Sequence, residues 1–178
     1  MISDGSAALN ESRWLQHIAF RLERGIDFLQ IRERDLATRE LIELTRKVLR
    51  LAKPSGTKIL VNDRADIVLA CGADGVHVRD GGVLPSHTGL FPRMLRSVAC
   101  HNPRTAGLLR DADYILLGPV FAPLSKNSSQ PPLGLTAIRE ASRLTRVPLL
   151  ALGGVTESNA KLCMEAGAAG VAGISLFQ

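Results

Sequence analysis

A chain of 178 residues is long enough for one domain that buries roughly 70% of the surface its unfolded form exposes. Apolar residues make up 46% and charged residues 22%, the ordinary composition of a soluble globular protein. The net charge of +5 comes from basic residues spread along the sequence, without the interleaved aromatic residues that stack on bases. We therefore expect one domain over residues 1–178 and no nucleic-acid partner.

The sequence carries no recognisable targeting segment. No apolar run approaches the ~20 residues that cross a bilayer, and the N-terminus lacks the basic and apolar stretches of a signal peptide. Cys71, Cys100 and Cys163 lack metal-ligand spacing and are expected to be reduced thiols. These features predict a cytoplasmic protein without a membrane partner.

Helix-like and strand-like segments alternate along the chain, and the strands are short, almost continuously apolar runs. In chain order we expect helix 6–24, strand 28–32, helix 36–51, strand 58–62, helix 66–70, strands 75–78 and 95–99, helix 103–109, strand 114–117, helix 135–144, strand 148–152, helix 156–166 and strand 170–174. Apolar strands separated by helices indicate a parallel sheet covered by helices.

The pattern predicts an α/β protein, a (β/α)8 TIM barrel that looks clipped at both ends. A complete barrel usually has ~200–250 residues. Here only Met1, Ile2 and Ser3 could form a first strand, and no helix follows the last strand. Truncation of a longer parent is the simplest cause of this pattern. A barrel strand left at an edge would expose unpaired backbone and invite a homodimer or aggregation.

Polar side chains follow the apolar strands at their C-terminal ends, where a parallel barrel carries its chemistry. Gln30, Arg32 and Arg34 alternate, so we expect them on one face. Guanidinium groups match phosphate through paired N–H donors. The alternative is an internal salt bridge of an arginine with Glu33, Asp35 or Asp63.

Asn62 and Asp63 end the strand 58–62. Mg²⁺ prefers one or two carboxylates together with phosphate oxygens of a substrate, so Asp63 is a candidate metal ligand. Asp is also a common N-cap, and capping of helix 66–70 is the alternative.

Glycines follow the last two strands, at Gly153-Gly154 and at Gly173-Ile174-Ser175. Loops in these positions often build a phosphate site from backbone N–H groups. Lys126 lies in a long loop over residues 118–132, and could close over a phosphate or stay solvated.

Two histidines also follow strands. His101 could act as a general acid or base near neutral pH or make a structural hydrogen bond, and for His77 we favour the structural role.

The sequence resembles the thiamine-phosphate synthase family and its thiazole tautomerase (TenI-type) branch over nearly its whole length. The motifs that carry the resemblance are QIRERD, VNDRAD, GADGVHV, ADYILLGPVF, PPLGL, VPLLALGGVT and AGAAGVAGIS. It implies a (β/α)8 barrel that couples hydroxymethylpyrimidine diphosphate to thiazole phosphate and releases diphosphate with Mg²⁺.

The resemblance also implies roles for residues at matching positions. Gln30, Arg32, Arg34, Asn62 and Lys126 would hold the pyrimidine diphosphate, and Asp63 the metal. The thiazole phosphate would be held by Ser125, Gly153, Gly154, Ile174 and Ser175. Small phosphate and diphosphate substrates are the partners that this implies.

Some positions depart from the synthase pattern. Arg34 stands where Lys is usual, Ala99 where Ser is, and Pro123 where Thr is. The second metal carboxylate falls at Gly82 or Val83, which leaves Asp80 as a displaced substitute. A metal-free tautomerase that uses His101, or a catalytically degenerate thiazole-phosphate-binding protein, are therefore the alternatives to a synthase.

Overall fold

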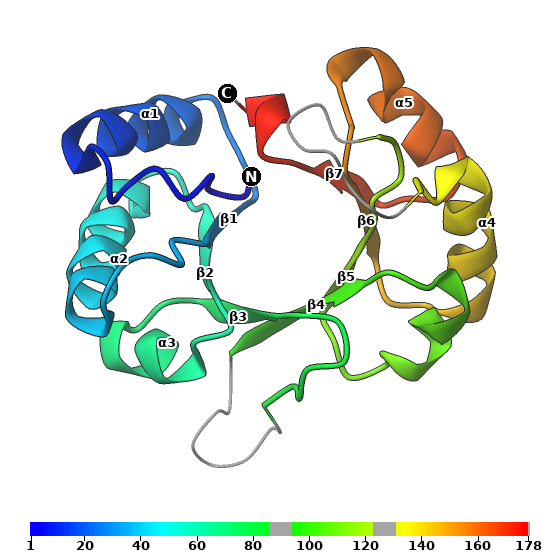
Figure 1. The fold of residues 1–178 in the computed structure, drawn as a ribbon, viewed down its shortest axis with the longest axis horizontal. Coiled ribbons are helices and arrows are strands. Elements are labelled where there is room, and N and C mark those ends of the chain that lie inside the picture. The colour runs from blue at the N-terminus through cyan, green and yellow to red at the C-terminus, as the bar shows by residue number, and fades with distance from the viewer. Residues whose placement is uncertain (86–93, 123–130, 178) are drawn as a thin grey trace. The chain divides into compact units, whose positions relative to one another are not determined.

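The computed structural model describes residues 1–85, 94–122 and 131–177 (Figure 1). Its contacts divide the chain into two compact units, which we describe separately. The first comprises Met1–His77 and, of the described residues beyond it, 94–95; the second comprises the described residues from 78–85 and from 96 onwards. The expectation of one domain stays a prediction.

The first unit contains three parallel strands, each preceded by a helix. In chain order its elements are α1 (Glu11–Glu23), β1 (Phe28–Ile31), α2 (Thr38–Ala52), β2 (Lys58–Asn62), α3 (Ala65–Cys71) and β3 (Gly75–Val78), of which Val78 belongs to the second unit. The three helices lie on one side of the strands (Figure 1). The register pairs Ile31 with Val61, and Asn62 with His77, so the strands end close together.

Residues 1–3 extend the sheet of the first unit beyond β1. Ile2 forms a parallel bridge with Gln30, the Ser3 N–H donates to the Gln30 carbonyl at 2.9 Å, and the Gln30 N–H donates to the Met1 carbonyl at 2.9 Å. These residues therefore lie alongside β1 through an isolated bridge, and a first strand at this place stays a prediction.

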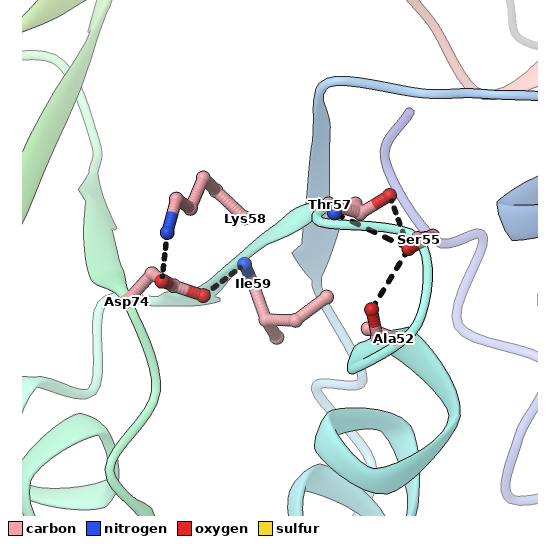
Figure 2. A network of polar contacts seen from close by, with 6 residues as sticks. All are labelled: Ala52, Ser55, Thr57, Lys58, Ile59 and Asp74. Carbon is pink, nitrogen blue, oxygen red and sulfur yellow. Dashed lines mark hydrogen bonds and ion pairs between the residues drawn. The ribbon is translucent and has the colours of Figure 1, made fainter.

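The N-terminal end of β2, opposite the end that carries Asn62, is held by polar contacts that stabilise the fold (Figure 2). Asp74 accepts from the Ile59 N–H at 2.9 Å and from Lys58 Nζ at 3.0 Å. Ser55 Oγ donates to the Ala52 carbonyl at 2.9 Å and accepts from the Thr57 N–H. The turn from α2 into β2 is thereby fixed at the end of the strand that carries no candidate site residue.

The second unit contains the other four parallel strands. Its elements are β4 (Leu95–Cys100), the 3₁₀ helix η1 (Pro103–Leu108), β5 (Tyr114–Leu117), α4 (Gly134–Leu144), β6 (Leu149–Leu152), α5 (Glu157–Glu165), β7 (Gly170–Ala172) and the 3₁₀ helix η2 (Ser175–Phe177). The first residue of β4, Leu95, belongs to the first unit. Each strand pairs with the next in chain order. Val98, Ile115, Leu117, Ile138 and Leu149 form the centre of its core, each at most 3% exposed.

Every predicted strand and helix is present, with shifts at several boundaries. The first helix begins at Glu11 because Asn10 caps it, its side-chain oxygen accepting from the Arg13 N–H at 3.0 Å. The segment after β4 is a 3₁₀ helix. The last strand stops at Ala172, where the chain turns into η2. In the described residues, no helix is long and apolar enough to cross a membrane.

Candidate active site

The first unit brings together polar side chains from the ends of neighbouring strands. Gln30 Nε2, from β1, donates to Asn62 Oδ1, from β2, at 2.9 Å. Asn62 Nδ2 in turn donates to Asp63 Oδ2 at 3.2 Å. Three of the predicted site residues therefore form one hydrogen-bonded row along the strand ends.

Gln30 carries an unusual acceptor. The residue is 4% exposed, and its Oε1 atom has no hydrogen-bond partner among the described residues. A buried polar atom without a partner costs about 1–3 kcal/mol. A bound ligand with an N–H or O–H donor would remove that cost.

Arg32 and Arg34 follow β1 directly. Arg32 is half-buried and Arg34 exposed, and neither occurs in the ion pairs found among the described residues. Burial lowers the pKa of Arg32, and the charge of Arg34 lowers it further, while Glu33 and Asp63 act in the opposite sense. Two guanidinium groups thus stand near each other, an arrangement that an anionic ligand would stabilise.

Asp63 has a strained backbone at the end of β2. Its φ of 54° lies in the left-handed region, which is uncommon for residues other than glycine and frequent at functional sites. Its N–H donates to the His77 carbonyl at 2.7 Å, and the N-cap of α3 is Arg64. The capping alternative for Asp63 is therefore wrong.

His77 is buried on β3 beside this group. Burial lowers the pKa of its imidazole to about 4, so the ring is neutral at pH 7. A ring that stays neutral through the physiological range is a poor general acid, which agrees with the predicted structural role.

In the second unit, His101 is held by two contacts from separate segments. Asp80 Oδ2 accepts from the His101 backbone N–H at 2.9 Å. The Gly118 carbonyl lies against His101 Nδ1, and because a carbonyl can only accept, Nδ1 carries the proton. Nε2 is then the ring nitrogen left to exchange a proton.

Asp80 thus has a structural role that sequence reasoning did not foresee. One of its carboxylate oxygens is engaged by the His101 amide. Its role as a metal ligand stays a prediction.

The loop after β6 requires glycine at two successive positions. Gly153 and Gly154 have φ values of 92° and 60°. A Cβ atom on Gly153 would lie 2.6 Å from Pro119 Cβ, and one on Gly154 would lie 2.4 Å from the Ala122 carbonyl oxygen. Close approach of two backbone segments therefore excludes any side chain here.

The second glycine loop follows the neighbouring strand. β6 and β7 pair at Leu152 and Ala172, so Gly153-Gly154 and Gly173-Ile174-Ser175 leave the sheet side by side. Within the described ranges, the backbone hydrogen bonds of turns and loops do not use the N–H groups of Gly154 or Ser175. Free amides of this kind suit a phosphate group.

Ser125 and Lys126, together with Pro123, lie outside the described residues. Among the described residues, no group of three or more His, Cys, Asp and Glu side chains could hold a metal ion. Mg²⁺ does not need such a group, because one carboxylate with substrate phosphate oxygens and water is a common set. Asp63 fits that mode.

Sequence reasoning missed two further residues that organise these groups. Glu33, which was one of three alternative salt-bridge partners for an arginine, is bound to the segment that precedes α1. Asn159 accepts from the Thr156 N–H at 2.8 Å and donates to the Gly154 carbonyl at 3.0 Å, which links α5 to the glycine loop. A polar residue three positions after a Thr was the available signal for Asn159.

These features define a class: an α/β protein with parallel strands and polar or glycine-rich segments at the strand ends. The sequence matches the thiamine monophosphate synthase family over residues 1–177. A protein of Geobacter sulfurreducens named "Putative thiamine-phosphate synthase" is 40% identical over 159 residues, which cover 86% of this chain and 74% of that protein. The thiamine-phosphate synthase of Koribacter versatilis is 37% identical over 166 residues, 90% of this chain and 78% of the relative.

The chain belongs to the thiamine monophosphate synthase family. The solved structure of thiamine phosphate pyrophosphorylase from Pyrococcus furiosus is similar in fold, with a TM-score of 0.82 at 24% identity. The similarity covers 98% of this chain and 83% of that one. It confirms the α/β class with a TIM-barrel-like fold, whereas the clipped first strand stays a prediction.

Proposed function

We propose that this chain is a thiamine-phosphate synthase, a transferase of thiamine biosynthesis. It would couple hydroxymethylpyrimidine diphosphate to thiazole phosphate and release diphosphate. The family match and the relatives that carry this name support the proposal.

The observation that carries the proposal is the set of polar side chains at the end of β1 in the first unit. The buried Gln30 has an acceptor without a partner, and two arginines stand next to it without an ion pair among the described residues. A pyrimidine with an N–H donor and a diphosphate would satisfy both. We assign Gln30 and Asn62 to the pyrimidine diphosphate, with Arg32 and Arg34 on its phosphates.

The glycine loops of the second unit would receive the other substrate. Gly153, Gly154, Ile174 and Ser175 supply backbone amides that suit the phosphate of the thiazole. Ser125 and Lys126 keep their predicted places in substrate binding.

Asp63 is the residue that would hold Mg²⁺, through its exposed carboxylate. The diphosphate of the substrate would supply further oxygen ligands. When bound, the metal would offset negative charge on the leaving diphosphate. Arg32 and Arg34 would stabilise the same charge through N–H donors as the C–O bond breaks and the electron pair leaves with diphosphate. The thiazole nitrogen would then supply the electron pair of the new C–N bond.

The test is an assay of thiamine phosphate formation with Asp63→Ala and a matched control. Asp66→Ala removes a carboxylate three residues later that is exposed and paired with Arg64. We expect Mg²⁺-dependent turnover in the wild type, retained in Asp66→Ala and lost by a factor of at least about 100 in Asp63→Ala, about 2.7 kcal/mol of barrier. Wild-type turnover that persists in EDTA would contradict the metal assignment.

The geometry of His101 favours one second candidate, a thiazole tautomerase. With Nδ1 bound to the Gly118 carbonyl, Nε2 is available to take a proton from the thiazole substrate. That activity would survive EDTA, vanish in His101→Ala and persist in His17→Ala, a change on α1. If neither turnover occurs but thiazole phosphate raises the Tm, the chain is a phosphate-binding protein.

A further inference from the structure

We propose that Glu33 is a positioning residue that holds Arg32 and Arg34 in place for the diphosphate. The inference rests on the proposed function, because it assigns a role to a residue that would not touch the substrate. In this proposal the segment Ser3–Ala7, hereafter the N-terminal loop, supports the residues that would bind the diphosphate.

Glu33 lies between Arg32 and Arg34 in the sequence, but in the described part of the chain its buried carboxylate binds the N-terminal loop and neither arginine. Its Oε1 accepts from Ser3 Oγ at 2.6 Å and from the Gly5 N–H at 3.3 Å, and its Oε2 accepts from the Ala7 N–H at 2.9 Å. Glu33 is 4% exposed, and Ser3 is 1% exposed. A buried carboxylate with three donors is a fixed point in the structure.

Ser3 transmits this fixed point to the arginine. While its Oγ donates to Glu33, it accepts from the backbone N–H of Arg32 at 2.8 Å. The Ser3 N–H also donates to the carbonyl of Gln30. One buried serine thus ties the backbone of two predicted ligand residues to the carboxylate of a third residue.

The contacts of Glu33 and Ser3 fix the chain from which the two arginine side chains project. Glu33 and the backbone N–H of Arg32 are both bound to Ser3, and the second carboxylate oxygen of Glu33 is bound to Ala7. Arg32 is half-buried and Arg34 is exposed. Anchoring Glu33 to the N-terminal loop would therefore hold the backbone of this segment in one position while the two guanidinium groups stay accessible to an anion.

A positioning role and a purely electrostatic role make opposite predictions. The Glu33 carboxylate lies close enough to Arg32 to raise the pKa of the guanidinium. If only charge mattered, removing it would leave the arginines more attractive to an anion, and diphosphate would bind more tightly. If position matters, diphosphate binding weakens even though the net charge becomes more favourable.

The experiment measures the Kd of inorganic diphosphate with Mg²⁺ by calorimetry for the wild type, Glu33→Gln and Ser3→Ala. Glutamine keeps the size of Glu33 but has one acceptor oxygen for three donors. We expect each variant to weaken diphosphate binding by about tenfold, about 1.4 kcal/mol. The Kd of thiazole phosphate should be unchanged.

Asp35→Asn is the matched control, because it removes the same charge two residues later at an exposed position. It should leave the diphosphate Kd equal or slightly tighter. If Glu33→Gln does not fold, Ser3→Ala carries the test, since it changes no charge. Diphosphate binding as tight as in the wild type in either folded variant would overturn the inference, whereas a wild type that binds no diphosphate would overturn the proposed function.

Discussion

Gly154 occupies a position where the backbone and its neighbours both exclude a side chain. A Cβ atom would lie 2.4 Å from the Ala122 carbonyl oxygen and 2.7 Å from Phe121 Cβ, on a residue whose φ is 60°. Backbone strain and overlap add, so Gly154→Ala should lower the free energy of unfolding by about 2–4 kcal/mol. Urea denaturation measures this change.

Gly56→Ala separates the two contributions. Gly56 has a φ of 74°, and nothing lies within 4 Å of the position its Cβ would take. Strain alone should cost about 1 kcal/mol there. Equal losses of stability in the two variants would show that the approach of Ala122 to Gly154 is unimportant.

Tyr114 is the one tyrosine of the chain, so its ionisation can be followed directly. Burial raises the pKa of its phenol to about 12, and a hydrogen bond with the Ser97 side chain acts in the opposite sense. Since the unfolded value is about 10, this burial contributes about 3 kcal/mol of stability below pH 10 that is lost as the pH rises from 10 to 12. Near-ultraviolet absorbance should show a native titration well above that of the chain in urea, and coincident titrations would contradict it.

At the scale of elements, α5 and the glycine loop before it are joined through one side chain. Asn159 lies in the first turn of α5, where it accepts from the Thr156 N–H and donates to the Gly154 carbonyl. Removing a capping residue costs about 1 kcal/mol, and here the loop also loses a donor. The start of α5 therefore helps to fix the segment that we assign to the thiazole phosphate.

Asn159→Ala should lower the free energy of unfolding by about 1–2 kcal/mol and weaken thiazole phosphate binding about fivefold. Lys161→Ala is the control on the same helix, because its pair with Glu165 is exposed and 3.8 Å long. It should change stability by less than about 0.5 kcal/mol. Tm and calorimetric Kd values are the measurements, and an unchanged Kd for Asn159→Ala would separate α5 from the binding loop.

The sequence predicted elements well where local signals suffice. β2 (Lys58–Asn62), β3 (Gly75–Val78) and β5 (Tyr114–Leu117) have the predicted bounds, because each is an apolar run followed by a polar residue or glycine. Contacts distant in sequence were less accessible. Nothing local to Glu33 indicates that Ser3, 30 residues earlier, would donate a hydrogen bond to it.

At the scale of the whole molecule, the family and the α/β class could be read from motifs, since these are short and contiguous. The hydrogen-bonded row of Gln30, Asn62 and Asp63 was predicted as a set of ligands, but its internal bonds depend on strand register, which the sequence does not encode locally. The same holds for His101, whose contacts come from Asp80 and Gly118, on different loops.

The central claim is that this chain couples hydroxymethylpyrimidine diphosphate to thiazole phosphate and releases diphosphate. Phosphorus NMR of the wild-type protein with both substrates and Mg²⁺ tests it in one sample. We predict that the resonances of the diphosphate ester are replaced by those of free diphosphate, while the phosphate monoester moves to the shift of thiamine phosphate. When EDTA removes the Mg²⁺, the spectrum of the two substrates should stay as it is. A diphosphate ester that stays intact, with thiazole phosphate bound or isomerised, would contradict the account.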